Sequence, residues 1–226
     1  MKIIITALFL QLINLCLTIW CSIYGFLSFN KLNKNKILIF LPSLSLLQII
    51  ISEAYKLKFT LQNRVGNFEH ITVSIYIIIE YIILVFFFLK TLDIKKNKFF
   101  KISILVFSVL LLINTAQENK TLAEQAYFSF LIFEGLTIEV LAFLSIINIF
   151  KKGKIEFLIT DTTSLFSVGI LFGFIIISPF SILQEYLINK SKNLYDLFFI
   201  ANSIGYIIMY LFFLFSIYVS RRTNNN

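Results

Sequence analysis

The sequence predicts an all-α integral membrane protein, a bundle of seven transmembrane helices. Of its 226 residues, 58% are hydrophobic and only 14% are charged, against about 25% charged residues in an average soluble domain. The mean hydropathy is +0.88. Long apolar stretches alternate with short links rich in Lys, Asn, Gln and Glu, and no link is long enough to fold by itself. We therefore expect residues 1–226 to form a single transmembrane domain rather than a soluble or disordered chain.

Seven stretches approach the roughly 20 apolar residues that a helix needs to cross a bilayer core of about 30 Å. They are residues 3–29, 37–54, 71–89, 99–114, 127–150, 164–183 and 195–219. Unpaired backbone groups are too costly in lipid, so each stretch is either a helix or a strand of a closed barrel. A barrel strand alternates apolar and polar residues over about ten positions, whereas these runs are longer and apolar all round. We expect helices.

Three of the seven stretches have features that bear on how their helices form and pack. The first, 3–29, exceeds the 7–15 apolar residues of a signal peptide and lacks an A-x-A cleavage site, so we expect a retained helix. The fourth, 99–114, is the shortest. In the sixth, Gly169 and Gly173 form a G-x-x-x-G pair, which is typical of close helix packing within a bundle or in a homodimer; we favour the bundle. Pro179 is expected to kink or end the outer part of that helix.

Basic residues are divided unevenly between the two sides of the predicted bundle. Seven of the 20 lie on the side of the N-terminus, namely Lys2, Lys56, Lys58, Arg64, Lys120, Lys190 and Lys192. The other 13 lie in the first, third and fifth links, near them, or at the C-terminus. Because cytoplasmic loops are enriched in Lys and Arg, we expect the N-terminus outside and the C-terminus inside. The net charge of +8 then faces anionic lipid, or a cytoplasmic signalling partner, and not nucleic acid.

Three carboxyl groups fall inside the predicted helices. Glu80 is near the centre of the third, Glu139 is near the centre of the fifth, and Glu134 is in the outer half of the fifth. Ionisable groups at this depth are costly and are therefore functional candidates. Since no Lys or Arg lies at comparable depth, we expect protonated carboxyls that make hydrogen bonds. Glu134 and Glu139 are about 140° apart around their helix, so at most one can point into a narrow interior.

Other polar side chains align with these carboxyls. Tyr76 and Glu80 are four residues apart and share one helix face, and Asn202 and Tyr206 belong to a polar stripe on the last helix that includes Tyr210. The alternative for all of these polar residues is a simpler role in helix packing. A hydrogen bond between two membrane helices stabilises their association by about 0.6 kcal/mol. The site that we predict for a ligand, ion or proton consists of Glu80, Tyr76, Glu139, Glu134, Asn202 and Tyr206.

His70, the single histidine, is expected at the outer end of the third helix, beside Glu69 and at a depth similar to Glu53. We predict that these three residues form the outer mouth of the site. A histidine near carboxylates can bind a metal or sense pH, but no paired histidines and no H-E-x-x-H motif are present. We therefore predict neither a metal nor a cofactor, and an interfacial histidine with satisfied hydrogen bonds is the simpler interpretation.

One set of features resembles a known group of membrane proteins. The run from His70 reads HITVSIYIIIEYIILVFFF and contains Tyr76-x-x-x-Glu80 followed by Tyr81. The two glutamates of 127–150 and the polar stripe of the last helix accompany it. In these features the chain resembles small seven-helix membrane proteins of Bacteroidetes-type bacteria. The resemblance implies a sensor-like protein, since similar helical modules occur alongside two-component signalling proteins, and it fixes no activity.

The sequence leaves three functions open. It has no G-x-S-x-G, P-loop or zinc signature. Our first hypothesis is a non-enzymatic sensor or signalling module of a bacterial inner membrane, with a polar site that opens to the outer face and cytoplasmic loops that contact a partner. The second is a small-solute or proton-coupled transporter that uses Glu80 and Glu139. The third is an intramembrane hydrolase that uses His70 and the outer carboxylates.

Overall fold

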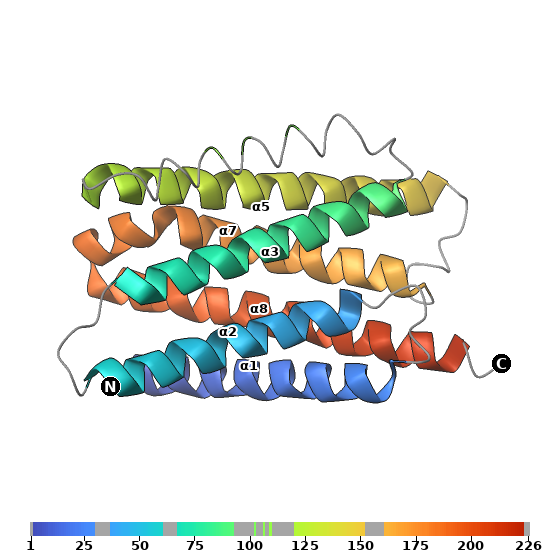
Figure 1. Ribbon diagram of the computed structural model, residues 1–226, viewed down its shortest axis with the longest axis horizontal. Helices are drawn as coiled ribbons and strands as arrows, with labels where there is room; N and C mark the ends of the chain where they lie inside the picture. The colour runs from blue at the N-terminus through green and yellow to red at the C-terminus, as the bar shows by residue number, and fades with distance from the viewer. Residues whose placement is uncertain are drawn as a thin grey trace.

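The computed structural model describes residues 2–29, 37–60, 67–92, 102, 106, 109, 120–151 and 161–223. In this part of the chain the regular structure is helical. The six long helices are α1 (Lys2–Leu27), α2 (Ile37–Thr60), α3 (Asn67–Thr91), α5 (Lys120–Lys151), α7 (Thr162–Lys190) and α8 (Lys192–Thr223). They lie side by side, with their axes along the long dimension of the molecule (Figure 1).

The six helices pack as a ring. α1 contacts α2, α2 contacts α3, α3 contacts α5, α5 contacts α7, α7 contacts α8, and α8 returns to α1. The contact between α7 and α8 is the most extensive, and that between α3 and α5 is the least extensive of these six. A buried site in this part of the molecule therefore has to be built from side chains that point into the ring.

The chain direction is the same in α3 and α5, although no other long helix between them is described. α1, α3, α5 and α8 run one way along the bundle, and α2 and α7 run the other way (Figure 1). The chain therefore leaves α3 at one end of the bundle and enters α5 at the opposite end. The N- and C-termini also lie at opposite ends (Figure 1).

Six of the seven predicted spans coincide with helices. Four helices are long and apolar enough to cross a membrane within the residues described, at Phe9–Leu27, Ile132–Lys151, Thr162–Phe180 and Asn193–Arg222. In α2 the described apolar stretch is shorter, Ile39–Ile51. All-helical structure with apolar stretches of this length is the structure that a bilayer requires. The fourth predicted span, 99–114, lies outside the described residues except for positions 102, 106 and 109.

Five of the described helices, α2, α3, α5, α7 and α8, extend beyond their predicted spans. The largest extensions are those of α2, which continues to Thr60, past residue 54, of α5, which begins at Lys120, before residue 127, and of α7, which continues to Lys190, past residue 183. Pro179 lies inside α7, so of the two expected effects, a kink or an end of the helix, it does not have the second. A proline removes one backbone donor, and in a membrane bundle the groups that it frees can find other partners, so a helix can continue through it.

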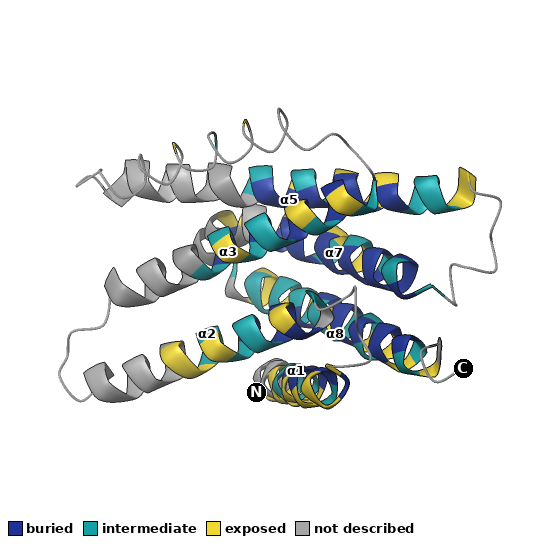
Figure 2. Ribbon diagram, turned by 45° about the vertical axis from the view of Figure 1, so that its right-hand side comes forward, coloured by how far each residue is buried: buried dark blue, intermediate teal, exposed yellow. Residues whose placement is uncertain are grey.

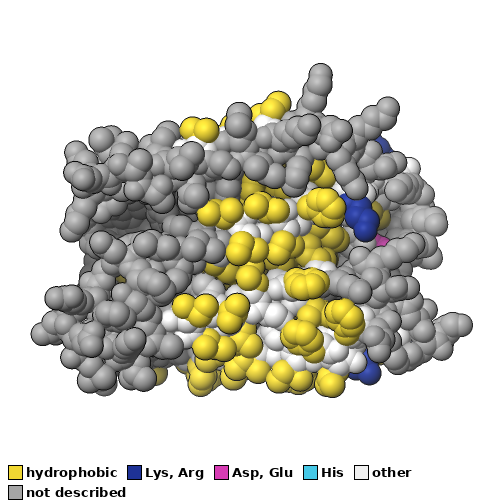
Figure 3. Space-filling view, viewed as in Figure 1, with side chains coloured by type: hydrophobic (Ala, Val, Ile, Leu, Met, Phe, Trp, Pro, Cys, Tyr) yellow, Lys and Arg dark blue, Asp and Glu magenta, His cyan; other side chains and the backbone are white. Residues whose placement is uncertain are grey.

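The interior of the ring is aromatic, and so is much of the outside. Phe166 stacks on Phe213 with ring centroids 4.7 Å apart and meets Phe87 at 4.8 Å, which joins α7, α8 and α3. On α1, Phe9 and Trp20 are more than half exposed. Exposed residues recur along α1 and α5 in Figure 2, and Figure 3 shows an apolar belt across the face in view. So large an apolar surface suits hydrocarbon rather than water.

α7 and α8 form a tight helical hairpin in which only Ser191 separates the two helices. A Cβ added at Gly169 would lie 2.6 Å from the Cβ of Phe212, and one added at Gly173 would lie 2.9 Å from the Cβ of Met209. Both glycines therefore let α8 approach α7 more closely than any side chain would allow. This confirms that the G-x-x-x-G pair packs within the bundle.

Candidate functional site

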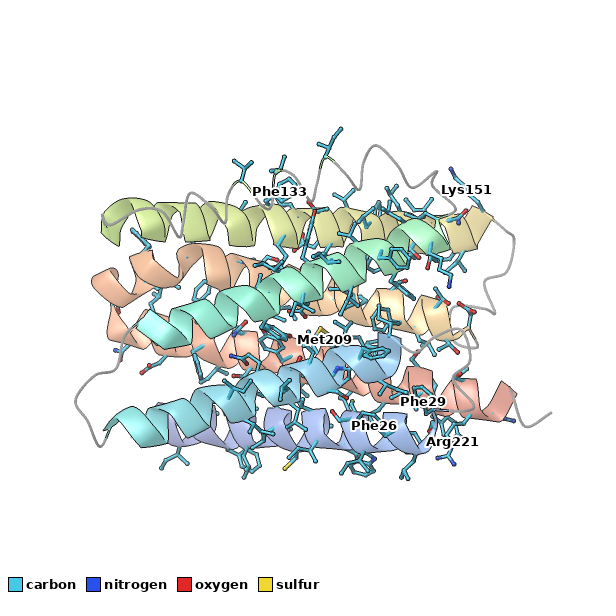
Figure 4. All side chains as sticks on the ribbon, viewed as in Figure 1. Phe26, Phe29, Phe133, Lys151, Met209 and Arg221 are labelled. Atoms are coloured by element: carbon cyan, nitrogen blue, oxygen red, sulfur yellow. The ribbon has the colours of Figure 1, made fainter. Side chains whose placement is uncertain are left out.

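Polar side chains from five helices approach one another inside the ring. Phe133 and Met209 lie near the middle of the bundle's length (Figure 4). They are the residues next to Glu134 and Tyr210 in the sequence. We name these residues the central polar cluster: Thr18, Ser45, Tyr76, Glu80, Glu134, Tyr206 and Tyr210.

The centre of the cluster is a hydrogen-bonded chain from α2 to α3. The Ser45 hydroxyl donates to the backbone carbonyl of Leu41 at 3.1 Å and lies 2.8 Å from the Tyr76 hydroxyl. The Glu80 carboxyl forms a side-chain hydrogen bond with Tyr76, one helical turn away on the same face. The structure thus pairs Tyr76 with Glu80 as their spacing predicts, and it adds Ser45 as the partner on the neighbouring helix.

Tyr210 connects α8 to the other side of the cluster. Its side chain is buried, and its hydroxyl lies beside the hydroxyl groups of Ser45 on α2 and Thr18 on α1. The Cys21 thiol donates to the Tyr210 carbonyl at 3.5 Å, which adds a second contact between α1 and α8. Tyr206, one turn away, is within electrostatic range of Tyr76. Long tyrosine side chains therefore connect helices across the interior of the ring.

Glu134 brings α5 into the cluster. The residue is only 5% exposed, and its carboxyl is within electrostatic range of Glu80. Its Oε1 atom is inaccessible and has no hydrogen-bond partner among the described atoms. The packing of Tyr81 against Phe133, with ring centroids 6.2 Å apart, holds α3 and α5 together beside the two glutamates. Two carboxyl groups on different helices thus share one buried environment.

Glu139 points away from this pair. Its Oε1 atom accepts a hydrogen bond of 2.7 Å from the Ser178 hydroxyl of α7. Gly135, one turn earlier, makes room for this contact, because a Cβ there would lie 2.5 Å from the Ser178 Oγ. We expected Glu139 among the partners of Glu80, but the described hydrogen bond of Glu139 is with α7. The different surroundings of Glu134 and Glu139 agree with their predicted separation around the helix.

Asn202 lies on α8 next to Ser203, which contacts α1. The Asn14 side-chain amide donates to the backbone carbonyl of Ser203 at 3.1 Å. The Oδ1 atoms of Asn14 and Asn202 are both buried without a hydrogen-bond partner in the described structure. No described contact joins Asn202 to Glu80. Its predicted place in the ligand site therefore stays a prediction.

The predicted outer mouth is described only as backbone. Glu53 lies in α2, and Glu69 and His70 lie in the first turn of α3, but the side chains of all three are outside the described residues. Their predicted role stays a prediction. Within the part of the chain that is described, no group of three or more His, Cys, Asp and Glu residues could hold a metal ion.

Sequence reasoning did not include Thr18 and Ser45 in the site, and it noted Tyr210 only as part of a stripe. Hydroxyl side chains in apolar helices commonly bond to the carbonyl four residues earlier, as Thr18 and Ser45 both do here. The type of residue therefore gives no indication of a second partner on another helix. One signal could have found Ser45: a tyrosine hydroxyl buried beside a carboxyl needs a second polar partner.

The arrangement as a whole can bind or release a proton or another cation, and can link that event to helix packing. It offers two carboxyls and several hydroxyls and, among the described side chains, no Lys or Arg at that depth. No protein-family model, curated protein or solved structure matches the chain. The resemblance to seven-helix proteins of Bacteroidetes-type bacteria therefore stays a prediction, and the function has to be argued from the cluster itself.

Proposed function

We propose that the chain is a multi-pass protein of a bacterial inner membrane that crosses the bilayer seven times, with its N-terminus outside and its C-terminus inside. The shared direction of α3 and α5 supports an additional crossing between Thr91 and Lys120 (Figure 1). The described basic side chains lie at the end of the bundle where α8 ends, including Lys151 and Arg221 (Figures 3 and 4). This is the end that the distribution of Lys and Arg assigns to the cytoplasm.

A reporter enzyme fused after Arg222 should therefore behave as cytoplasmic, and the same reporter inserted at Arg64 should behave as periplasmic. The first position is at the end of α8. The second follows the end of α2, which lies at the opposite end of the bundle. Paired reporters that are active only in the cytoplasm or only in the periplasm would measure both sites. A periplasmic signal after Arg222 would contradict either the orientation or the number of crossings.

Our functional proposal is a non-enzymatic sensor or signalling module. One observation carries it: the central polar cluster connects helices that lie on different sides of the ring. A ligand that enters from the outer face and binds Glu80 or Glu134 would change the contacts that hold α3 against α2, α5 and α8. A ligand with different affinity for two packing arrangements shifts the population between them. The cytoplasmic ends of the helices would pass that shift to a signalling partner.

The experiment that tests this proposal measures whether a change in the cluster moves the cytoplasmic end of the bundle. Spin labels at Lys90→Cys on α3 and Arg222→Cys on α8, in a Cys16→Ser background, report the distance between two exposed positions. We expect Glu80→Gln to shift this distance distribution. Glu139→Gln is the matched control, because Glu139 bonds to Ser178 outside the cluster. Identical distance distributions in the Glu80→Gln variant and in the protein with Glu80 intact would refute the sensor proposal.

The second candidate is a proton-coupled transporter. The observation that favours it is the shared buried environment of two carboxyl groups, Glu80 and Glu134, because such groups mark proton and ion pathways through membranes. In this transporter proposal, Glu80 acts together with Glu134 and not with Glu139. Transport predicts net movement of protons or ions across a liposome bilayer that contains the protein, whereas a sensor requires none.

A further inference from the structure

Glu134 is a buried acceptor without a hydrogen-bond partner in the described part of the chain. It is 5% exposed, and its Oε1 atom has no hydrogen-bond partner among the described atoms. Buried polar atoms in native structures are nearly always hydrogen-bonded, so an exception needs an explanation. In hydrocarbon the requirement is stricter, because water does not supply a partner. The Oε1 atom is therefore suited to accept from, or to coordinate, something that comes from outside the chain.

Glu80 lies at the end of a chain of hydroxyl groups. The Ser45 hydroxyl lies 2.8 Å from the Tyr76 hydroxyl, and Tyr76 is in turn hydrogen-bonded to Glu80. We expect the Glu80 carboxyl to be protonated in these surroundings, because burying its charge without a cation is costly.

The groups that face this carboxyl do not compensate a negative charge. α5 presents Glu134, α8 presents Tyr206 and Tyr210, and α2 presents the Ser45 hydroxyl. On α1, Cys21 lies beside Tyr210. None of these groups carries a positive charge. A carboxylate buried among them is unfavourable unless a cation arrives as its proton leaves.

We propose that Glu80 and Glu134 together bind one Na⁺ in exchange for one proton. The O–H bond of one carboxyl breaks, the proton passes to water, and Na⁺ takes its place between the oxygens of the two groups. The net charge of the pair is the same before and after the exchange. This proposal names the ligand of the same site and therefore rests on the function proposed above.

The chemistry of the cluster favours a small monovalent cation. Its atoms are carboxyl and hydroxyl oxygens, which are the ligands that hard cations prefer. A divalent ion needs more: Ca²⁺ takes six to eight oxygens, and Mg²⁺ keeps several waters in an octahedral shell. The two glutamates fall short of such a shell, in keeping with the lack of a three-residue metal cluster among the described side chains.

Proton release measures the exchange directly, because a cation that replaces a proton must release it. The full-length protein in detergent, in weakly buffered solution with a pH indicator, is mixed with NaCl or with choline chloride at the same ionic strength. We expect about one proton per chain with saturating NaCl and none with choline chloride. Glu134→Gln should release none, and Glu139→Gln should release as much as the unmodified protein.

The outcomes separate this proposal from the sensor proposal. No release from the unmodified protein, or equal release from Glu134→Gln, would overturn the Na⁺ site. If Glu134→Gln does not fold, as judged by circular dichroism, Glu80→Gln serves as the second variant and should also release none. Proton release together with net Na⁺ flux in liposomes would keep the site and replace the sensor by a transporter. A shifted spin-label distance without proton release would keep the sensor and remove Na⁺ as its ligand.

Discussion

Replacing Phe166 with alanine should lower the free energy of unfolding by about 3–5 kcal/mol. Phe166 is 1% exposed and contacts Phe213 and Phe87 on two other helices. Helix association in a bilayer depends on close van der Waals packing, since lipid is as apolar as the core. Removing the ring leaves a cavity at the junction of α3, α7 and α8, where many dispersion contacts are lost together.

Phe172→Ala is the matched control on the same helix. Phe172 is 52% exposed and stacks on Phe212 with ring centroids 6.5 Å apart, so its loss leaves no buried cavity. Reversible unfolding of each variant in mixed micelles, followed by circular dichroism, gives the two changes in free energy. Similar losses for Phe166→Ala and Phe172→Ala would show that the junction around Phe166 is not the centre of packing.

The helices could be predicted from the sequence because the bilayer imposes a length. An apolar stretch of about 20 residues can cross a bilayer as a helix, which pairs its own backbone groups. Six predicted spans coincide with helices in the structure. The ends of α2 and α7 were predicted too early, because an apolar stretch ends where the hydrocarbon ends. The helix itself can continue into the interface, and the Lys, Glu and Gln residues found there are good helix formers.

The site was less predictable because it depends on the rotation of each helix about its axis. The spacing of Tyr76 and Glu80 fixes their shared face, whichever way α3 turns. The choice between Glu134 and Glu139 depends on how α5 packs against α7, and Gly135 with Ser178 decides it. Nothing in the sequence of α5 alone indicates that its partner helix offers a serine at that level. A pattern within one helix can be predicted, whereas contacts between helices require the packing.

Glu80→Gln should remove the infrared absorption of a protonated, hydrogen-bonded carboxyl group and leave the helical content and membrane insertion unchanged. The amide keeps the shape of the side chain and can keep its hydrogen bond with Tyr76. It has no exchangeable carboxyl proton, so any response of the protein to Na⁺ should be abolished. The measurement is a difference spectrum between the variant and the unmodified protein, recorded in lipid.

Tyr76→Phe and Glu80→Leu complete this test. Tyr76→Phe removes the hydroxyl that is hydrogen-bonded to Glu80 and should shift the carboxyl band to higher frequency without removing it, since a free carbonyl stretch lies above a hydrogen-bonded one. Glu80→Leu should change the stability by only about 0.6–1.7 kcal/mol, the range of a single polar contact in a membrane bundle. If Glu80→Gln leaves both the spectrum and the Na⁺ response intact, Glu80 is ionised or serves only to join α3 to its neighbours. The Na⁺ site would then fail, because it depends on a titratable proton at this position, whereas the spin-label distances decide the sensor proposal.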